Sequence, residues 1–197
     1  MGKLIVVVGN AGVGKTTLVN VLRANGMYNT GLEEHIERPF QALFKTDRRY
    51  ALANQVDYLL LRAEQERLIR QSRQMGIQDG GLDMDFYIFT RLFLQKGYLS
   101  AGEFSLCKRL YSQIRAAQPY PERIIWMQAP LEVVAVRFAL RGRPLEIAER
   151  DDLKVIDSLL QEWLNRLDPT KLIRFDASEE DPTYRNLLPA LLVQLKS

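Results

Sequence analysis

The feature that most constrains this chain is a glycine-rich octapeptide that follows a short apolar run near the N-terminus. The apolar run occupies positions 4–8, and a segment with helix-forming residues begins directly after the octapeptide. The eight residues match the phosphate-binding pattern G-x-x-x-x-G-K-[ST] in the strand–loop–helix context that this pattern requires. They are Gly9, Asn10, Ala11, Gly12, Val13, Gly14, Lys15 and Thr16. The sequence therefore predicts a P-loop that binds the phosphates of a nucleotide.

Each part of this loop has a chemical reason. The glycines allow a tight turn that directs several backbone N–H groups at one anion, and the positive end of the following helix adds to the attraction. We expect Lys15 to reach the outer phosphates and the hydroxyl of Thr16 to hold Mg²⁺, with Thr17 beside them. The alternative is an ordinary turn without a ligand, but the four fixed positions match by chance in only about 1% of chains this long.

Length, net charge and cysteine content limit the classes of protein to which this chain can belong. The chain has 197 residues, which suits a single domain spanning 1–197. Its net charge of +3 is too small to indicate a nucleic-acid partner. The single cysteine, Cys107, excludes an internal disulfide and favours a reducing compartment, so we expect a cytoplasmic protein. The early apolar run of five residues is far shorter than the ~20 residues of a membrane span, so we expect no membrane partner.

Apolar, strand-like segments alternate with helical patterns along the chain. The predicted strands are 3–8, 28–32, 75–79, 123–128 and 172–175, and the predicted helices are 14–24, 39–44, 49–73, 82–95, 103–117, 131–140, 151–167 and 183–195. In the long helix 49–73, a 3-4 spacing predicts one buried apolar face. That face consists of Leu52, Val56, Leu59, Leu60 and Ala63. The alternation predicts an α/β fold, with a five-stranded parallel sheet covered by helices on both faces.

Ligands of such sheets bind beyond the carboxyl ends of the strands. This rule places the P-loop, Glu37, Asp79 and the segment after the fourth strand at one edge. A GTPase is disfavoured because the nearest match to Asn-Lys-x-Asp, at residues 165–168, lacks the lysine. A large ATPase motor is excluded by size. Phosphoryl transfer to a small molecule remains.

Two further segments resemble the deoxynucleoside kinase family. These are Glu37-Arg38-Pro39-Phe40 and the stretch 50–62, which contains Gln55 and Arg62 seven residues apart on one helix face. The resemblance is strongest to the bacterial deoxyadenosine/deoxyguanosine kinase branch. It extends from about residue 3 to 176 and implies a P-loop kinase fold with a short arginine-rich lid at about 141–150. Arg137, Arg141 and Arg143 resemble that lid.

The resemblance also implies roles for individual residues. Glu37 would be the general base on the nucleoside 5′-hydroxyl, and Gln55 would read the base with help from Arg62 and Asp85. The aromatic ring that stacks on the base is left open. Phe86, Phe44 and Tyr50 are the candidates for this ring.

The phosphate side of the reaction receives roles from the same resemblance. Arg141 and Arg143 would cover the transferring phosphoryl group, Arg137 would bind ATP, and Asp79 would hold Mg²⁺ together with Thr16. ATP and Mg²⁺ are the expected cofactors, a nucleoside is the expected small-molecule partner, and a homodimer through the long helices is the expected assembly.

The chain departs from the family in one place. After the third strand the family carries an acid, an arginine and a serine, whereas this chain has Asp79 followed by Gly80 and Gly81. Either another arginine supplies the missing charge, with Arg38 and Arg48 as candidates, or the acceptor differs, or the protein is weakly active or inactive. Each charged candidate also has a plain alternative, as a solvated loop or helix-surface residue or a helix-terminal charge.

These observations predict ATP-dependent phosphorylation of a purine deoxynucleoside at its 5′-hydroxyl. One alternative is a nucleoside monophosphate kinase or another small-molecule kinase of the same fold. A monophosphate acceptor would need a second phosphate pocket, for which Arg38, Arg48 and Arg91 are candidates. The other alternative is a non-catalytic nucleotide-binding subunit, which the Gly80–Gly81 replacement suggests.

Overall fold

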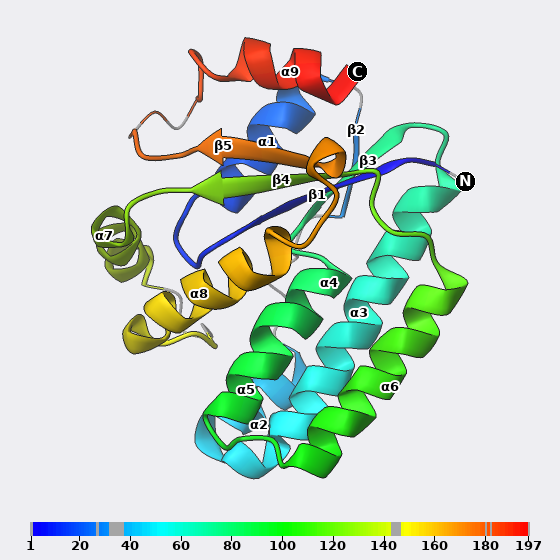
Figure 1. Cartoon of the computed structure of the whole chain (residues 1–197), viewed down its shortest axis with the longest axis vertical. Coiled ribbons are helices and arrows are strands. Elements are labelled where there is room, and N and C mark those ends of the chain that lie inside the picture. Colours follow the sequence, from blue (N-terminus) through cyan, green and yellow to red (C-terminus); the bar gives the residue numbers. More distant parts are fainter. Residues whose placement is uncertain are drawn as a thin grey trace.

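The computed structural model describes residues 2–26, 28–31, 38–142, 147–179, 181 and 183–196. Its centre is a five-stranded sheet in the order β2-β3-β1-β4-β5, with all neighbouring strands parallel (Figure 1). The strands are β1 Leu4–Gly9, β2 Tyr28–Gly31, β3 Met75–Asp79, β4 Arg123–Gln128 and β5 Leu172–Asp176. Val7 of β1 lies opposite Asp79 on one side and Ile125 on the other, so the carboxyl ends of these strands meet at one edge.

Helices cover both faces of this sheet. The α-helices are α1 Lys15–Asn25, α2 Pro39–Thr46, α3 Ala51–Gln71, α4 Leu82–Met84, α5 Arg91–Gln95, α6 Ala101–Ala117, α7 Leu131–Arg141, α8 Leu153–Leu164 and α9 Leu188–Lys196. Short 3-10 turns occur at η1 Arg48–Tyr50, η3 Arg150–Asp152 and η4 Pro169–Lys171, and a π-helical turn occurs at η2 Asp85–Thr90. In Figure 1, α1 and α9 lie on one side of the sheet, and α3, α4 and α8 lie on the other. The predicted α/β P-loop kinase fold is confirmed.

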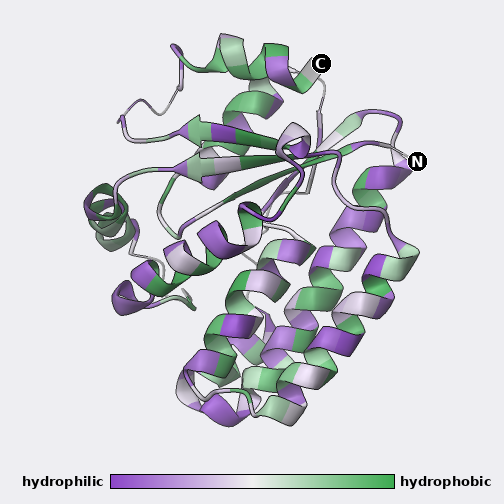
Figure 2. Ribbon diagram, viewed as in Figure 1, coloured by the Kyte–Doolittle hydropathy of each residue, from purple (hydrophilic) through white to green (hydrophobic). Residues whose placement is uncertain are grey.

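Two apolar clusters hold these layers together. The larger surrounds the sheet, where every residue of β1 is buried, as its unbroken apolar sequence predicts. The smaller lies among α2, α3, η2 and α6, away from the sheet, and includes Phe44, Leu59, Phe86 and Tyr111. Figure 2 shows apolar and polar bands alternating along these lower helices. Within the described residues, no helix has the length and apolarity to cross a bilayer.

The long helix α3 corrects one prediction. Leu59 and Ala63 are buried as expected, but Leu60 is 43% exposed. The buried side of α3 carries polar residues that a 3-4 count of apolar positions passes over. These are Asn54, Gln55, Arg62, Glu66 and Arg70. Two of them have charged partners on neighbouring elements: Arg62 pairs with Asp85 of η2, and Glu66 pairs with Arg115 of α6.

Other helices also differ from the prediction. Helix α6 begins two residues earlier than expected, because Ser100 and Glu103 form a reciprocal capping box. The predicted helix 82–95 contains the π-helical turn η2 between α4 and α5. The last helix begins at Leu188, five residues later than expected. Tyr184, at a φ of +48°, adopts a left-handed conformation that does not continue a right-handed helix.

Candidate active site

The P-loop has the backbone conformation that its glycines allow. Gly12 and Gly14 adopt φ values of +86° and +105°. A Cβ at Gly12 would lie 2.9 Å from the backbone nitrogen of Phe138, and a Cβ at Gly14 would lie 2.4 Å from the hydroxyl of Tyr184. Gly14 is the N-cap of α1, and no side chain of the described residues caps that helix, so its first turn directs N–H groups outward. The loop is therefore built for an anion.

Lys15 lies folded against this loop. Its Nζ donates to the carbonyl oxygens of Gly9 at 3.1 Å and Asn10 at 3.0 Å. Asn10 is buried, and its side chain forms hydrogen bonds both within the loop and to α8. Its Oδ1 accepts from Ala11 N, and its Nδ2 donates to the Leu153 carbonyl at the start of α8. The ammonium group is thus already at the loop that would receive the phosphates.

Thr16, in the first turn of α1, meets Asp79 at the carboxyl end of β3. The Thr16 hydroxyl donates to Asp79 Oδ2 at 2.6 Å. Asp79 is 1% exposed, and among the described residues its other oxygen, Oδ1, has no hydrogen-bond partner. A buried carboxylate oxygen without a partner is costly. A hydroxyl and a carboxylate at this position have the oxygen chemistry that suits Mg²⁺, so the two residues fit the ion that the sequence predicts.

Gly80 and Gly81 have a conformational reason for being glycine. Their φ values are +81° and +90°, a region that other L-residues rarely adopt. A Cβ at Gly80 would contact the Arg62 guanidinium at 3.4 Å. The connection from β3 to α4 thus takes a path that an arginine–serine pair would not adopt without strain.

The helical side of the site is built around a buried ion pair. Arg62 of α3 donates from Nε to Asp85 Oδ2 at 2.8 Å, and from Nη1 to the carbonyl of Asp79 at 3.1 Å. Both side chains are under 10% exposed. The Arg62 guanidinium therefore connects the end of β3 to the start of η2. It also brings together two residues that the sequence proposed for one site.

The π-helical turn explains where Gln55 lies. The carbonyl of Asp85 accepts hydrogen bonds from Gln55 Nε2 and from the Thr90 hydroxyl, each at 3.1 Å. A π turn leaves such a carbonyl outside the regular α-helical pattern, and π turns often occur at functional sites. Gln55 is buried beside the Arg62–Asp85 pair, and its amide nitrogen is engaged with the backbone.

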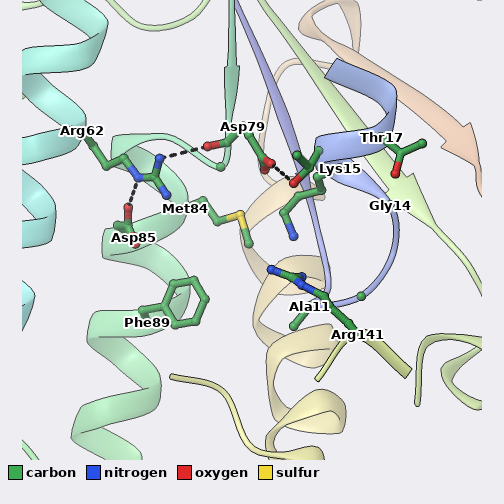
Figure 3. A pocket seen from close by; sticks show the side chains of 13 residues that line it. Ala11, Gly14, Lys15, Thr17, Arg62, Asp79, Met84, Asp85, Phe89 and Arg141 are labelled. Atoms are coloured by element: carbon green, nitrogen blue, oxygen red, sulfur yellow. Dashed lines mark hydrogen bonds and ion pairs between the residues drawn. The ribbon is translucent and has the colours of Figure 1, made fainter. Parts of the chain in front are cut away.

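One cavity joins the phosphate side to the helical side. It has a volume of about 210 Å³, and its lining includes Lys15, Thr16, Arg62, Asp79 and Asp85. Figure 3 shows that Lys15 and Arg141 point into it from the P-loop side, with Met84 and Phe89 on the opposite side. The cavity thus places cationic side chains at one end and an ion pair with an aromatic ring at the other.

The three aromatic residues proposed to stack on the base, Phe86, Phe44 and Tyr50, lie outside the cavity lining. Phe86 is buried in the helical cluster, where its ring stacks on Tyr111 at 4.2 Å between centroids. Phe44 is in the same cluster, and Tyr50 is 37% exposed. None of the three lines the cavity, whereas Phe89 does. Phe89 and Met84 were not among the residues predicted from the sequence, although helical periodicity from Asp85 indicates Phe89, four residues later.

Arg137 lies on the other side of the P-loop. It donates to the carbonyls of Ala177 at 2.6 Å, Ser178 at 3.1 Å and Glu179 at 3.0 Å, and so fixes the segment after β5. A second cavity of about 380 Å³ lies here, lined by Gly12, Gly14, Thr17, Arg137 and Tyr184 among others. The P-loop therefore lies between the first cavity and this second one. The predicted residues Thr17 and Arg137 belong to the second one, and Thr17 also lines the first.

The remaining arginine candidates lie away from the cavity. Arg38 is paired with Asp57. Arg48 lies 4.6 Å above the Phe44 ring, and Arg91 donates to Glu162 at 2.7 Å. Glu37 and Arg143 lie outside the described residues, as does part of the expected lid, 143–146.

Known proteins share this chain's sequence pattern. A family model described as "Deoxynucleoside kinase" matches residues 5–188, a range that contains the P-loop and every described residue of the first cavity. The chain is also 24% identical over 182 residues to a protein of Bacillus subtilis (strain 168) named deoxyadenosine/deoxycytidine kinase. That similarity covers 90% of this chain and 84% of the Bacillus protein.

Proposed function

Because the chain belongs to the deoxynucleoside kinase family, whose activity is phosphate transfer from ATP to deoxynucleosides, we propose that its acceptor is the 5′-hydroxyl of a purine deoxynucleoside. The observation that carries this proposal is that one cavity is lined both by Lys15 and Thr16 and by the Arg62–Asp85 pair. Deoxyadenosine is the first choice. It is common to the branch that the sequence resembles and to the name of the Bacillus relative.

The phosphate side of the cavity is assigned to ATP. The N–H groups of the P-loop and the start of α1 bind the phosphates, and Lys15 exchanges its two carbonyl contacts for them. Thr16 and Asp79 would hold Mg²⁺, which when bound neutralises charge on the phosphate oxygens. Arg137 keeps the segment after β5 against the second cavity, where the adenine of ATP has room.

The helical side is assigned to the nucleoside base. Arg62 and Asp85 present a donor and an acceptor for the base edge, with Gln55 beside them, and Phe89 offers a ring for its face. This arrangement directs the 5′-hydroxyl toward the P-loop. Glu37 is proposed as the general base on that hydroxyl, and Arg141 and Arg143 as the groups that offset charge on the transferring phosphoryl group.

The assembly proposed for this enzyme is a homodimer. Leu60 of α3 and Leu106 of α6 are 43% and 45% exposed, and α3 and α6 lie side by side in the helical layer (Figure 1). A second copy packed on these helices would remove both side chains from water. Sedimentation of the wild-type chain and of a Leu60→Glu variant tests this. A dimer that the variant abolishes supports it, and a wild-type monomer contradicts it.

The test of the proposed function is product detection with ATP, Mg²⁺ and a panel of nucleosides and nucleoside monophosphates. Conversion of deoxyadenosine to its 5′-monophosphate, faster than that of deoxycytidine, supports the proposal. Faster conversion of deoxycytidine contradicts the purine preference, and turnover of monophosphates alone identifies a different acceptor. Glu37→Gln is the matched variant. It should lose turnover and still bind ATP if Glu37 is the base.

A further inference from the structure

The segment that carries Met84, Asp85 and Phe89 is attached in an unusual way. It is entered through Gly80 and Gly81, two consecutive residues with positive φ and no side chains to pack. Helix α4 then has only three residues before the π-helical turn begins. Glycine gives the backbone the greatest conformational freedom of any residue. The entry to this segment therefore contributes little to fixing its position.

Besides the hydrogen bonds that Arg62 and Gln55 make with Asp85, a second buried carboxylate, Asp83, attaches the segment to α6. Asp83 Oδ1 accepts from the Tyr111 hydroxyl at 2.7 Å and from Arg115 Nε at 3.0 Å, both on α6. Asp83 is 5% exposed and Tyr111 is 5% exposed. Burial raises the pKa of the Tyr111 phenol, so its hydroxyl stays protonated and remains a donor. Asp83 lies two residues before Asp85, within the same turn of chain.

The partners of Asp83 are themselves anchored. Arg115 also donates to Glu66 of α3 from Nη1 at 3.0 Å and from Nη2 at 2.8 Å. Glu66 in turn accepts from Arg70 Nε at 3.2 Å. Bidentate arginine–carboxylate pairs have a fixed geometry as well as a favourable energy. A continuous buried network thus ties the segment to both long helices.

Tyr111 makes a second contact with the same segment, because its ring stacks on Phe86 at 4.2 Å and 7°. We propose that Tyr111 and Arg115 are positioning residues for nucleoside binding: they clamp Asp83 and thereby fix where Asp85 and Phe89 meet the base. Neither lines the cavity, so they act through the segment rather than by contact with the substrate. This inference rests on the proposed placement of the base at Arg62 and Asp85.

The clamp predicts a selective kinetic defect. Tyr111→Phe keeps the ring stack on Phe86 and removes only the hydrogen bond to Asp83. We expect the KM for the deoxynucleoside to rise about five- to tenfold, since hydrogen bonds to charged groups are among the stronger ones. The KM for ATP should stay within about twofold of wild type, because the P-loop lies on the sheet side.

Two matched variants separate positioning from general stability. Tyr98→Phe removes a hydroxyl from the same helical layer, where Tyr98 packs on Phe44 and Phe93, and should leave the nucleoside KM unchanged. Asp83→Asn keeps an oxygen that accepts from Tyr111 and Arg115, so it should affect KM less than Asp83→Ala. A purely structural role would instead lower the folded fraction in proportion and leave KM unchanged.

The experiment measures the KM for each substrate and the amide hydrogen exchange of residues 82–90 in wild type and the variants. Raised nucleoside KM with faster exchange confined to 82–90 in Tyr111→Phe supports the clamp. An unchanged nucleoside KM in Tyr111→Phe overturns it. If wild type phosphorylates no nucleoside, the proposed function fails, and the exchange then decides the clamp alone, with unchanged rates overturning it.

Discussion

The P-loop side and the helical side of the cavity recognise ligands by different means. On the P-loop side, glycine conformations and the start of α1 present backbone groups from one stretch of eight residues. On the helical side, recognition depends on buried charges from separate elements, with Arg62, Asp79 and Asp85 joined by hydrogen bonds. A contiguous backbone site tolerates changes elsewhere, whereas a site of buried charges depends on every partner.

The largest expected effect comes from removing one buried charge. Arg62→Met leaves Asp85 buried without its ion-pair partner, which should lower the free energy of unfolding by about 3–5 kcal/mol. Urea unfolding measures this. The double variant Arg62→Met with Asp85→Leu should recover most of that stability, because no unpaired charge remains. Nucleoside binding should be lost in both variants, and a stable single variant would contradict the dependence of this side on its pair.

The next effect concerns the P-loop side. Lys15→Ala should lower kcat about 10²- to 10³-fold, since one electrostatic stabiliser of the reacting phosphate is removed. Stability should change little, because the hydrogen bonds of Lys15 within the described residues go to two backbone carbonyls. Rates at saturating ATP and nucleoside measure the loss. Lys154→Ala, an exposed lysine of α8, serves as the control. Full activity in Lys15→Ala would refute this assignment.

A smaller effect is expected from replacing Phe89, the aromatic residue that lines the cavity. Phe89→Leu should raise the KM for the deoxynucleoside about fivefold, because an aromatic contact contributes about 1 kcal/mol beyond its buried area. The KM for ATP should not change. Phe93→Leu is the matched control, since Phe93 is buried in the helical cluster and does not line the cavity. Equal KM changes in the two variants would show that Phe89 has no special place in the site.

The smallest effect lies at the surface, where Glu149 connects the segment before α8 to α5. Lys96 Nζ donates to Glu149 at 2.9 Å, and this hydrogen bond holds the pKa of Glu149 below its usual range. A lowered carboxyl pKa stabilises the fold above the unfolded value of about 4.5, and the gain is lost as pH falls below it. Because Glu149 is more than half exposed, the gain is only about 0.5 kcal/mol.

Thermal unfolding of wild type and Glu149→Gln across pH tests this estimate. The difference in stability should be present at pH 7, shrink in high salt and disappear as pH falls through the lowered pKa of Glu149. A difference that does not change across the acidic range would show that the side chain acts by packing. A loss as large as that of Arg62→Met would remove the contrast between buried and exposed charges.

The sequence predicted the P-loop side of the cavity more completely than the helical side. The P-loop and the parallel sheet follow from contiguous patterns, an apolar strand and fixed glycine spacings, and the structure confirms both the fold and the loop conformation. The helical side depends on which residues meet after folding. Arg62 and Asp85 were placed together through a family resemblance, whereas periodicity alone predicted an apolar face for α3 and did not foresee its buried charges.

The errors have identifiable physical sources. Leu60 was expected inside because apolar spacing was counted without the charged partners that α6 presents to the neighbouring face. Phe86, Phe44 and Tyr50 were the candidates for the stacking ring, and Phe89 was not among them. The ring of Phe86 instead stacks on Tyr111, a residue distant in sequence that no local pattern indicates. The Gly80–Gly81 departure is a backbone requirement of positive φ, and side-chain motifs do not encode it.

The most direct test of the central claim is a crystal structure of the enzyme with ADP and deoxyadenosine. The account predicts phosphates at the P-loop amides and Lys15, with the adenine edge within hydrogen-bonding distance of Arg62 or Asp85. The adenine face should lie against Phe89, and the 5′-hydroxyl should point toward the P-loop. A nucleoside bound outside this cavity, or with its base turned away from the Arg62–Asp85 pair, would contradict the account.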